Sequence, residues 1–327
     1  MNKWFAISTS ILVSGVVAAG LTAASVTPSL AAGKSQIFVL YAGSMTAVME
    51  NKIRPDLNRR FGIEFQGEGK GSNALAQMIK SGISSPDVFI SASPSVNTQL
   101  LMGNQNHNLV KWYLPLAADQ LVIAFSKSSK FYPSLVKAEK GQLAWYNVLE
   151  QKGFRFGRTD PILDPKGVST LFMFELAQKY YHQPNLFKKV LGTVENTSQV
   201  FPEETLLAQL TTGQMDAIVA YKHEAVEWHV PYITLPSAIN LGDVKDAKYY
   251  ASATYHPQVG KVQKGAPILF TITIPSTVKN EKGAETFVRY LVAGAGHKIL
   301  MQDGFTPVKE KLVGQLSALP KSLRPLI

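Results

Sequence analysis

Residues 154–181 place acidic side chains at the predicted start of a helix. Asp160 and Asp164 each precede a proline, and the residue before a proline avoids the helical region. We expect Gly167 to make a tight turn, because the apolar residues of 171–180 then recur at helical spacing. Free N–H groups at a helix N-terminus favour a bound anion, whereas neighbouring carboxylates repel one. A ligand of this segment must therefore satisfy both kinds of group.

Three further junctions between a predicted strand and a predicted helix carry small polar or acidic residues. They are Gly43-Ser44, Ser72-Asn73 and Pro202-Glu203-Glu204. Hydroxyl and N–H groups at the start of a helix bind anions without needing a lysine. The glycines at 67, 69 and 71 match neither nucleotide-binding fingerprint. We therefore expect the two glycine/serine junctions, before Ser44 and before Asn73, to share one anion site.

The elements that must position these residues alternate between strand and helix. The continuous apolar run at 36–42 is typical of a parallel strand buried on both faces, and helical periodicity follows at 46–61. Further strands are expected at 63–66, 87–91, 121–126, 217–221 and 268–274, and helices at 74–80, 204–211 and from Glu281. This order predicts doubly wound α/β sheets, in which ligands bind beyond the carboxyl ends of the strands.

The first 31 residues have the pattern of a signal peptide. Lys3 supplies the positive start, 11–21 is apolar, and small residues at Ser29 and Ala31 suit cleavage after Ala31. We expect an exported, periplasmic or otherwise extracytoplasmic protein, with an uncleaved anchor as the alternative. The rest of the chain is predicted to form two lobes, with a crossing near 117–120. Residues 34–118 and 272–327 would form lobe 1, and residues 119–271 lobe 2.

Composition excludes several kinds of site and favours one kind of partner. The 327 residues include no cysteine, so a disulfide, a thiolate nucleophile and a cysteine-ligated metal site are excluded. The formal charge of +10 favours an anionic partner. Lysine and arginine are scattered, without the aromatic interleaving of a nucleic-acid surface, so we predict no nucleic-acid partner.

Catalytic and metal-binding motifs are incomplete. The run from His223 to His229 lacks the second histidine four residues after the first that a zincin needs, and we expect it at the surface. No G-x-S-x-G pattern surrounds Ser44, so we predict that the protein is not an enzyme. Tyr180-Tyr181 and Tyr249-Tyr250 could ligate ferric iron, although packing is the simpler interpretation.

Several motifs together resemble a known family. They are Tyr-Ala-Gly-Ser (41–44), Gly-Glu-Gly-Lys-Gly-Ser (67–72), Gly-Arg-Thr-Asp-Pro-Ile-Leu-Asp-Pro-Lys-Gly (157–167), Ala-Gln-Lys-Tyr-Tyr (177–181) and Leu-Pro-Ser-Ala-Ile-Asn-Leu-Gly-Asp (235–243). In this order they resemble the tungstate/molybdate-binding proteins of ABC importers, in the branch first known from archaea. The resemblance covers nearly the whole chain after the signal peptide. It implies an α/β fold of two doubly wound lobes joined by a two-stranded hinge, as in type II periplasmic binding proteins.

The resemblance also implies a ligand and its contacts. The lobes would close, in a monomer, on a tetrahedral tungstate or molybdate ion and deliver it to an ABC permease, without a cofactor. The family's contact positions correspond here to Gly43, Ser44, Ser72, Asp164, Pro165, Lys166, Glu203 and Tyr221. Lys166 would contribute its main-chain N–H, at a position that is commonly a cysteine in this branch.

Two carboxylates in this branch approach the metal and expand its coordination from four towards six. Asp164 matches the first. Counting back from Tyr221 selects Glu203 as the second, whereas aligning on Pro-x-Glu-Thr selects Glu204. Sulfate, thiosulfate or another oxyanion is an alternative ligand that leaves the carboxylates unexplained, and ferric ion is another.

Overall fold

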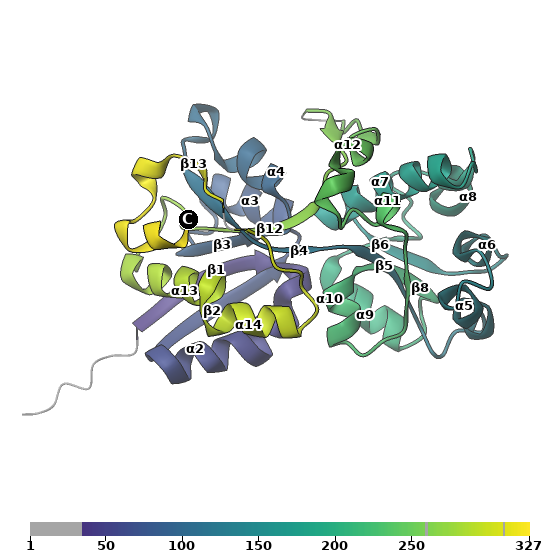
Figure 1. Cartoon of the computed structure of the whole chain (residues 1–327), viewed down its shortest axis with the longest axis horizontal. Coiled ribbons are helices and arrows are strands. Elements are labelled where there is room, and N and C mark those ends of the chain that lie inside the picture. Colours follow the sequence, from purple (N-terminus) through teal and green to yellow (C-terminus); the bar gives the residue numbers. More distant parts are fainter. Residues whose placement is uncertain (1–34, 259–260, 310) are drawn as a thin grey trace, which may run out of the picture. The chain divides into compact units, whose positions relative to one another are not determined.

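The computed structural model describes residues 35–258, 261–309 and 311–327 (Figure 1). The predicted signal peptide at 1–31 lies outside the described residues. Within those residues, no helix is both long enough and apolar enough to cross a membrane.

The first sheet has six strands in the order β13-β4-β12-β3-β1-β2. Their bounds are β1 Ser35–Ala42, β2 Ile63–Lys70, β3 Val88–Ser91, β4 Trp112–Asp119, β12 Ile268–Thr273 and β13 Val313–Gly314. β1 pairs in parallel with both β2 and β3, which confirms the prediction from its continuous apolar run. β12 runs antiparallel to both β3 and β4, so the sheet is mixed.

The second sheet has five strands in the order β7-β6-β8-β5-β9. Their bounds are β5 Leu121–Phe125, β6 Phe156–Thr159, β7 Val200–Phe201, β8 Ala217–Tyr221 and β9 Tyr232–Thr234. Only Gln120 separates β4 from β5, so the chain enters the second sheet within the predicted crossing. All of β12 pairs in the first sheet, so the chain has returned before residue 268. The lobe boundary at 271/272 stays a prediction.

Helices cover both sheets (Figure 1). Those of the first are α1 Thr46–Val48, the π turn Met49–Ile53, α2 Arg54–Phe61, α3 Ser72–Lys80, α4 Pro94–Val96, α13 Glu281–Ala293 and α14 Ala295–Gln302. Those of the second are α5 Tyr132–Glu139, α6 Trp145–Leu149, α7 Pro165–Tyr180, α8 Leu186–Leu191, α9 Glu203–Thr211 and α10 Lys222–Glu227. Between β9 and β12 lie α11 Ser237–Asn240, α12 Ala247–Tyr250 and a small hairpin of β10 Thr254–Tyr255 and β11 Gln263–Lys264.

One prediction about α7 is wrong. The helix begins at Pro165, and Gly167 lies inside its first turn and makes no tight turn before it. Pro165 suits the first helical position because its missing N–H would be unpaired there anyway. A Cβ at Gly167 would lie 2.5 Å from Pro161 N and 2.7 Å from Thr159 O. Glycine is therefore needed here for close packing of α7 against the preceding loop.

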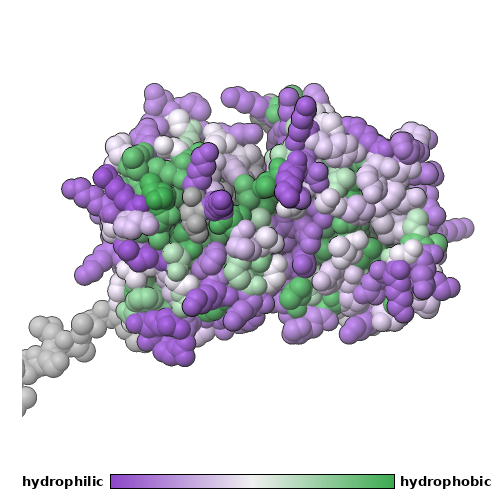
Figure 2. Space-filling model, in the orientation of Figure 1, coloured by the Kyte–Doolittle hydropathy of each residue, from purple (hydrophilic) through white to green (hydrophobic). Residues whose placement is uncertain are grey.

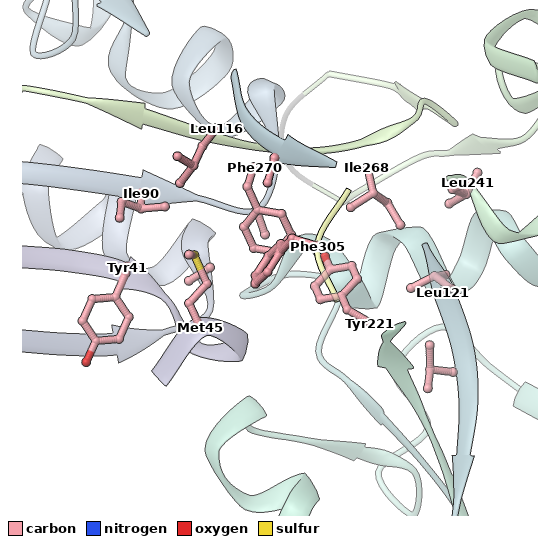
Figure 3. Close-up of a cluster of buried hydrophobic side chains, with 14 of the residues drawn as sticks. Tyr41, Met45, Ile90, Leu116, Leu121, Tyr221, Leu241, Ile268, Phe270 and Phe305 are labelled. Atoms are coloured by element: carbon pink, nitrogen blue, oxygen red, sulfur yellow. The ribbon is translucent and has the colours of Figure 1, made fainter. Parts of the chain in front are cut away.

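Apolar side chains of the two sheets form one buried cluster (Figure 3). Tyr41 and Ile90 of the first sheet belong to it, as does Leu121 at the start of the second. At the junction the ring of Phe270 lies 5.4 Å from that of Tyr221 and 5.2 Å from that of Phe305, centroid to centroid. Packing therefore continues across the crossing and supports the end of β8, where the candidate site begins.

The visible surface matches the scattered charge of the sequence. Hydrophilic side chains project over much of the face in Figure 2, with smaller hydrophobic areas between them. The prediction that no nucleic acid binds stays a prediction.

Candidate functional site

Five predicted site residues lie where a strand ends or the next helix begins. Ser44 is in the 3-10 turn after β1, Ser72 is the first residue of α3, and Asp164 is the N-cap of α7. Glu203 is the first residue of α9, and Tyr221 is the last residue of β8. All five are buried. This is the placement expected for a ligand site at the carboxyl ends of strands.

The structure brings the two sheets into contact at these residues. A Cβ at Gly43, after β1, would lie 2.9 Å from Glu203 Cγ. Glu203 is 6% exposed, whereas Glu204 is exposed. Burial therefore distinguishes the two glutamates that the sequence left as alternatives, because only Glu203 faces inward. Both also border a cavity of about 300 Å³ that Asp164 lines as well.

Asp164 is held through one of its carboxylate oxygens. Its Oδ1 accepts a hydrogen bond of 2.6 Å from the main-chain N–H of Lys166 and a longer one of 3.4 Å from Thr159 Oγ1. In this structure the Lys166 N–H donates to Asp164, which is the N-cap of α7. Its predicted use as a donor to the anion stays a prediction. Burial, and then the nearby charge of Glu203, raises the pKa of Asp164 to about 7.

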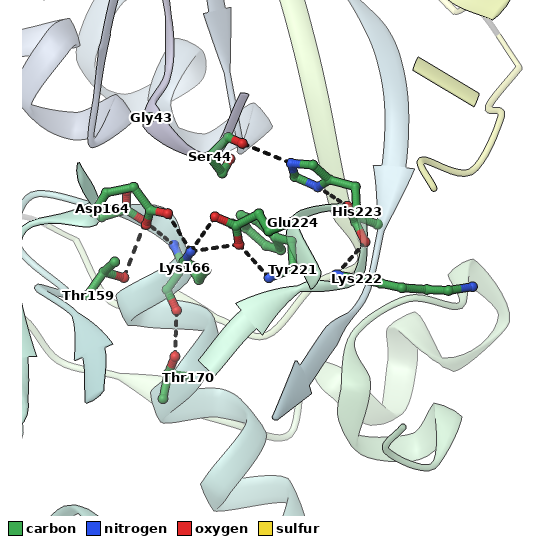
Figure 4. Close-up of polar contacts among 12 residues, drawn as sticks. Gly43, Ser44, Thr159, Asp164, Lys166, Thr170, Tyr221, Lys222, His223 and Glu224 are labelled. Atoms are coloured by element: carbon green, nitrogen blue, oxygen red, sulfur yellow. Dashed lines mark hydrogen bonds and ion pairs between the residues drawn. The ribbon is translucent and has the colours of Figure 1, made fainter. Parts of the chain in front are cut away.

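The side chain of Lys166 has a role that the sequence reasoning missed. It is fully buried, and its Nζ lies 2.6 Å from Glu203 Oε1 and 2.8 and 3.0 Å from the two oxygens of Glu224 (Figure 4). Burial alone lowers the pKa of a lysine, but the carboxylates of Glu203 and Glu224 raise the pKa of Lys166 overall. Lys166 is therefore a buried ammonium ion.

The two glutamates beside Lys166 differ in their protonation. Burial by itself raises the pKa of Glu203, but the charge of Lys166 lowers that pKa below its ordinary value. Burial, and then the charge of Glu203, raises the pKa of Glu224 well above its ordinary value. Glu203 is thus the ionised partner of Lys166, and Glu224 is the one that takes up a proton first.

The prediction that the segment from His223 to His229 lies at the surface is wrong at its start. His223 and Glu224 are both fully buried. Glu224 Oε2 accepts a hydrogen bond of 2.6 Å from the main-chain N–H of Tyr221. A signal was present in the sequence: both residues directly follow a buried strand, as the other site residues do.

His223 connects the two sheets. Its Nε2 lies 3.0 Å from the main-chain oxygen of Ser44, and its Nδ1 contacts the carboxylate of Asp119 at the end of β4. Both ring nitrogens of His223 therefore have a hydrogen-bond partner. The imidazole also stacks on Phe305 at a centroid distance of 3.9 Å. His223 therefore holds the turn that carries Ser44 against the start of α10.

Three polar atoms of the site are buried without a hydrogen-bond partner in the described structure. They are Ser44 Oγ, Glu203 Oε2 and Tyr221 Oη. An unpaired buried polar group costs about 1–3 kcal/mol. Ser72 differs, because its Oγ accepts a hydrogen bond of 3.1 Å from the main-chain N–H of Ala92. Two hydroxyls and one carboxylate oxygen are thus available to a ligand.

The tyrosine pairs that could have held iron lie elsewhere and have other partners. Tyr181 Oη accepts a hydrogen bond from Trp145 Nε1, and Tyr250 Oη donates one to the main-chain oxygen of Ser237. Across residues 35–258, 261–309 and 311–327, no group of three or more histidine, aspartate or glutamate side chains is arranged to hold a metal ion. Packing is therefore the role that the structure shows for Tyr181 and Tyr250.

Comparison with known proteins identifies the family. Residues 37–306 match the model of the bacterial extracellular solute-binding proteins. The chain belongs to this family. The predicted fold class, two α/β lobes of the periplasmic binding protein type, is thereby confirmed, and the family is one of solute-binding transport proteins.

Individual relatives of this solute-binding protein span nearly its whole length. It is 31% identical to a putative molybdenum-binding ABC transporter protein of Haloferax volcanii, over 90% of this chain and 89% of that one. It is 27% identical to the molybdate/tungstate-binding protein WtpA of Thermococcus kodakarensis, over 93% and 91% of the two chains. The solved periplasmic molybdate-binding protein of Azotobacter vinelandii shares the fold. Its TM-score is 0.60 at 15% identity, and the match covers 83% of this chain and 99% of that one.

Proposed function

We propose that this protein captures tungstate or molybdate outside the cytoplasmic membrane and delivers it to an ABC permease. The observation that carries the proposal is the set of three buried, unpartnered atoms, Ser44 Oγ, Tyr221 Oη and Glu203 Oε2. The two hydroxyls can donate hydrogen bonds to the oxo groups of an oxyanion. The carboxylate oxygen cannot donate one while Glu203 is ionised, and so it needs a hydrogen-bond donor or an electrophilic centre.

The metal of tungstate or molybdate meets that need. A carboxylate repels the oxygen shell of sulfate, and sulfur does not accept further oxygen ligands. Tungsten and molybdenum accept them, so Glu203 and Asp164 can each approach the metal centre. Both hydrogen bonds that the carboxylate of Asp164 accepts within the described structure go to Oδ1. Its Oδ2 is therefore left for the metal. The names of the relatives from Haloferax and Thermococcus support the same ligand class.

The remaining features of the proposal follow from this role. The protein acts without catalysis, is exported by a cleavable signal peptide at 1–31, and works as a monomer that closes on its ligand. Gly43 and Pro165, the main-chain N–H of Lys166 and the hydroxyl of Ser72 also belong to the proposed site. The boundary between lobes at 118/119 and 271/272 also remains part of the proposal.

Calorimetric titration of the purified protein tests the ligand. The panel is tungstate, molybdate, sulfate, phosphate and ferric citrate. We expect tungstate or molybdate to bind more tightly than sulfate by at least about a hundredfold, or about 2.8 kcal/mol. Sulfate or phosphate as the tightest ligand would reject the metal-coordinating role. A purple ferric complex would instead identify an iron carrier.

Replacing the two serines should separate ligand binding from stability. Ser44→Ala removes a hydroxyl that has no partner among the described residues, so the free energy of unfolding should not fall. Tungstate affinity should fall about tenfold to a hundredfold, because a hydrogen bond to a charged group contributes about 1.5–3 kcal/mol. Ser72→Ala also leaves the Ala92 N–H unpaired, and it should therefore lower stability as well. Urea unfolding and calorimetry measure the two effects. Unchanged affinity in Ser44→Ala would contradict the proposed contact.

A further inference from the structure

One residue, Lys166, holds both carboxylates that are proposed to reach the metal. Its main-chain N–H donates to Asp164 Oδ1 at 2.6 Å, and its side-chain Nζ donates to Glu203 Oε1, also at 2.6 Å. Asp164 Oδ2 accepts no hydrogen bond within the described residues, and Glu203 Oε2 accepts none there from an N–H group or an alcohol or phenol hydroxyl. Lys166 thus fixes one oxygen of each group and leaves one for a ligand.

Glu224 completes this arrangement. Its two oxygens lie 2.8 and 3.0 Å from Lys166 Nζ, and one of them also accepts the main-chain N–H of Tyr221 at 2.6 Å. Glu224 therefore joins the lysine to the strand end that carries the third proposed contact, the hydroxyl of Tyr221. Glu203 is therefore not the only side chain that accepts hydrogen bonds from the ammonium of Lys166.

We propose that Lys166 and Glu224 are the positioning pair of the site, which make Asp164 and Glu203 one-oxygen ligands of the metal and set its coordination. The inference rests on the proposed function, and neither residue needs to touch the ligand through its side chain. Because Glu224 also accepts hydrogen bonds from Lys166 Nζ, Glu203 can give Oε2 to the metal while Oε1 stays on Lys166.

A purely stabilising role explains these contacts poorly. Buried ion pairs are often no more stable than an apolar pair of similar volume, because removing the charges from water costs free energy. An ion pair that served stability alone would also leave no oxygen of Glu203 unpartnered. The chain offers a comparison on the same helix, where Lys179 pairs with Glu175 at 3.4 Å and both side chains are partly exposed.

The test compares the double variant Lys166→Met/Glu224→Gln with Lys179→Met/Glu175→Gln. Both remove one lysine of α7 and one of its glutamate partners, and the first also removes the Lys166–Glu203 pair. The glutamine side chain introduced by Glu224→Gln can still accept the Tyr221 N–H. We expect the first variant to bind tungstate about tenfold to a hundredfold more weakly, the usual effect of losing a partner of a metal ligand. X-ray absorption at the tungsten edge of the saturated complex should show fewer ordered longer W–O distances than in wild type. The second variant should match wild type in both measurements.

Several results would overturn the inference. Wild-type affinity and coordination in the first variant would reduce the pair to a structural contact. Tighter binding would show that Lys166 competes with the metal for Glu203. If that variant does not fold, a crystal structure of the wild-type tungstate complex decides, since Lys166 Nζ must remain within hydrogen-bond distance of Glu203. If wild type itself binds neither tungstate nor molybdate, the proposed function fails and the inference falls with it.

Discussion

Lys166→Met alone should lower the free energy of unfolding of the ligand-free protein by about 3–5 kcal/mol, the usual cost of removing one partner from a buried ion pair. The ammonium is fully buried between Glu203 and Glu224, which are themselves 6% and 0% exposed. Without it, Glu203 Oε1 has no partner, and two carboxyl groups face each other in a site of low dielectric constant. Urea unfolding at neutral pH, followed by circular dichroism, measures the loss.

Two controls show whether the loss comes from uncompensated charge. Adding Glu203→Gln should recover most of the stability, because the ionised partner is removed together with the lysine. Lys179→Met, on the exposed face of the same helix, should change stability by less than about 1 kcal/mol, as is usual for surface ion pairs. A loss below about 1 kcal/mol in Lys166→Met would mean that water or a rearranged side chain replaces the ammonium.

Asp164→Asn should weaken tungstate binding and at the same time stabilise the ligand-free protein. Loss of an indirect partner of a metal ligand typically costs about 10–100-fold in affinity, so loss of a direct carboxylate should cost at least as much. Asparagine can still accept the Lys166 N–H and cap α7. What it removes is a buried negative charge close to Glu203, and that charge is unfavourable until a ligand arrives.

The expected gain in stability of Asp164→Asn depends on pH. The pKa of Asp164 is about 7 in the folded protein, against an ordinary value of 3.8. The unfolded chain therefore loses this proton at lower pH than the folded protein, and the stability of wild type falls as pH rises through that window. Asp164→Asn abolishes that contribution. Each pKa unit corresponds to about 1.4 kcal/mol, so a gain of about 1–3 kcal/mol is expected near pH 8.

A matched control exists elsewhere in the chain. Asp243 is also an N-cap, and its Oδ1 accepts the main-chain N–H of Lys245, two residues on, at 2.9 Å. Asp243→Asn should leave tungstate affinity unchanged. If Asp164→Asn binds tungstate more tightly than wild type, the carboxylate only repels the anion, and coordination of the metal by Asp164 is wrong.

The sequence alone determined which residues form the junctions of the site. An apolar run with parallel-strand character ends shortly before Ser44, a second strand ends shortly before Ser72, and a buried strand ends at Tyr221. These patterns depend on burial of neighbouring residues along one element, so they are visible locally. The predicted start of α7 was wrong because the Asp164-Pro165 pair was taken to interrupt the helix. The same pair supplies an N-cap and a favourable first helical residue.

Only the tertiary structure decided the charge arrangement inside the site. A lysine is buried only where carboxylates from other elements meet it. The partners of Lys166 lie 37 and 58 positions further along the chain, and no local pattern links them. The same holds for His223, which reaches a main-chain oxygen 179 positions away. Such contacts arise from how the two sheets pack together, and periodicity within one segment carries no information about them.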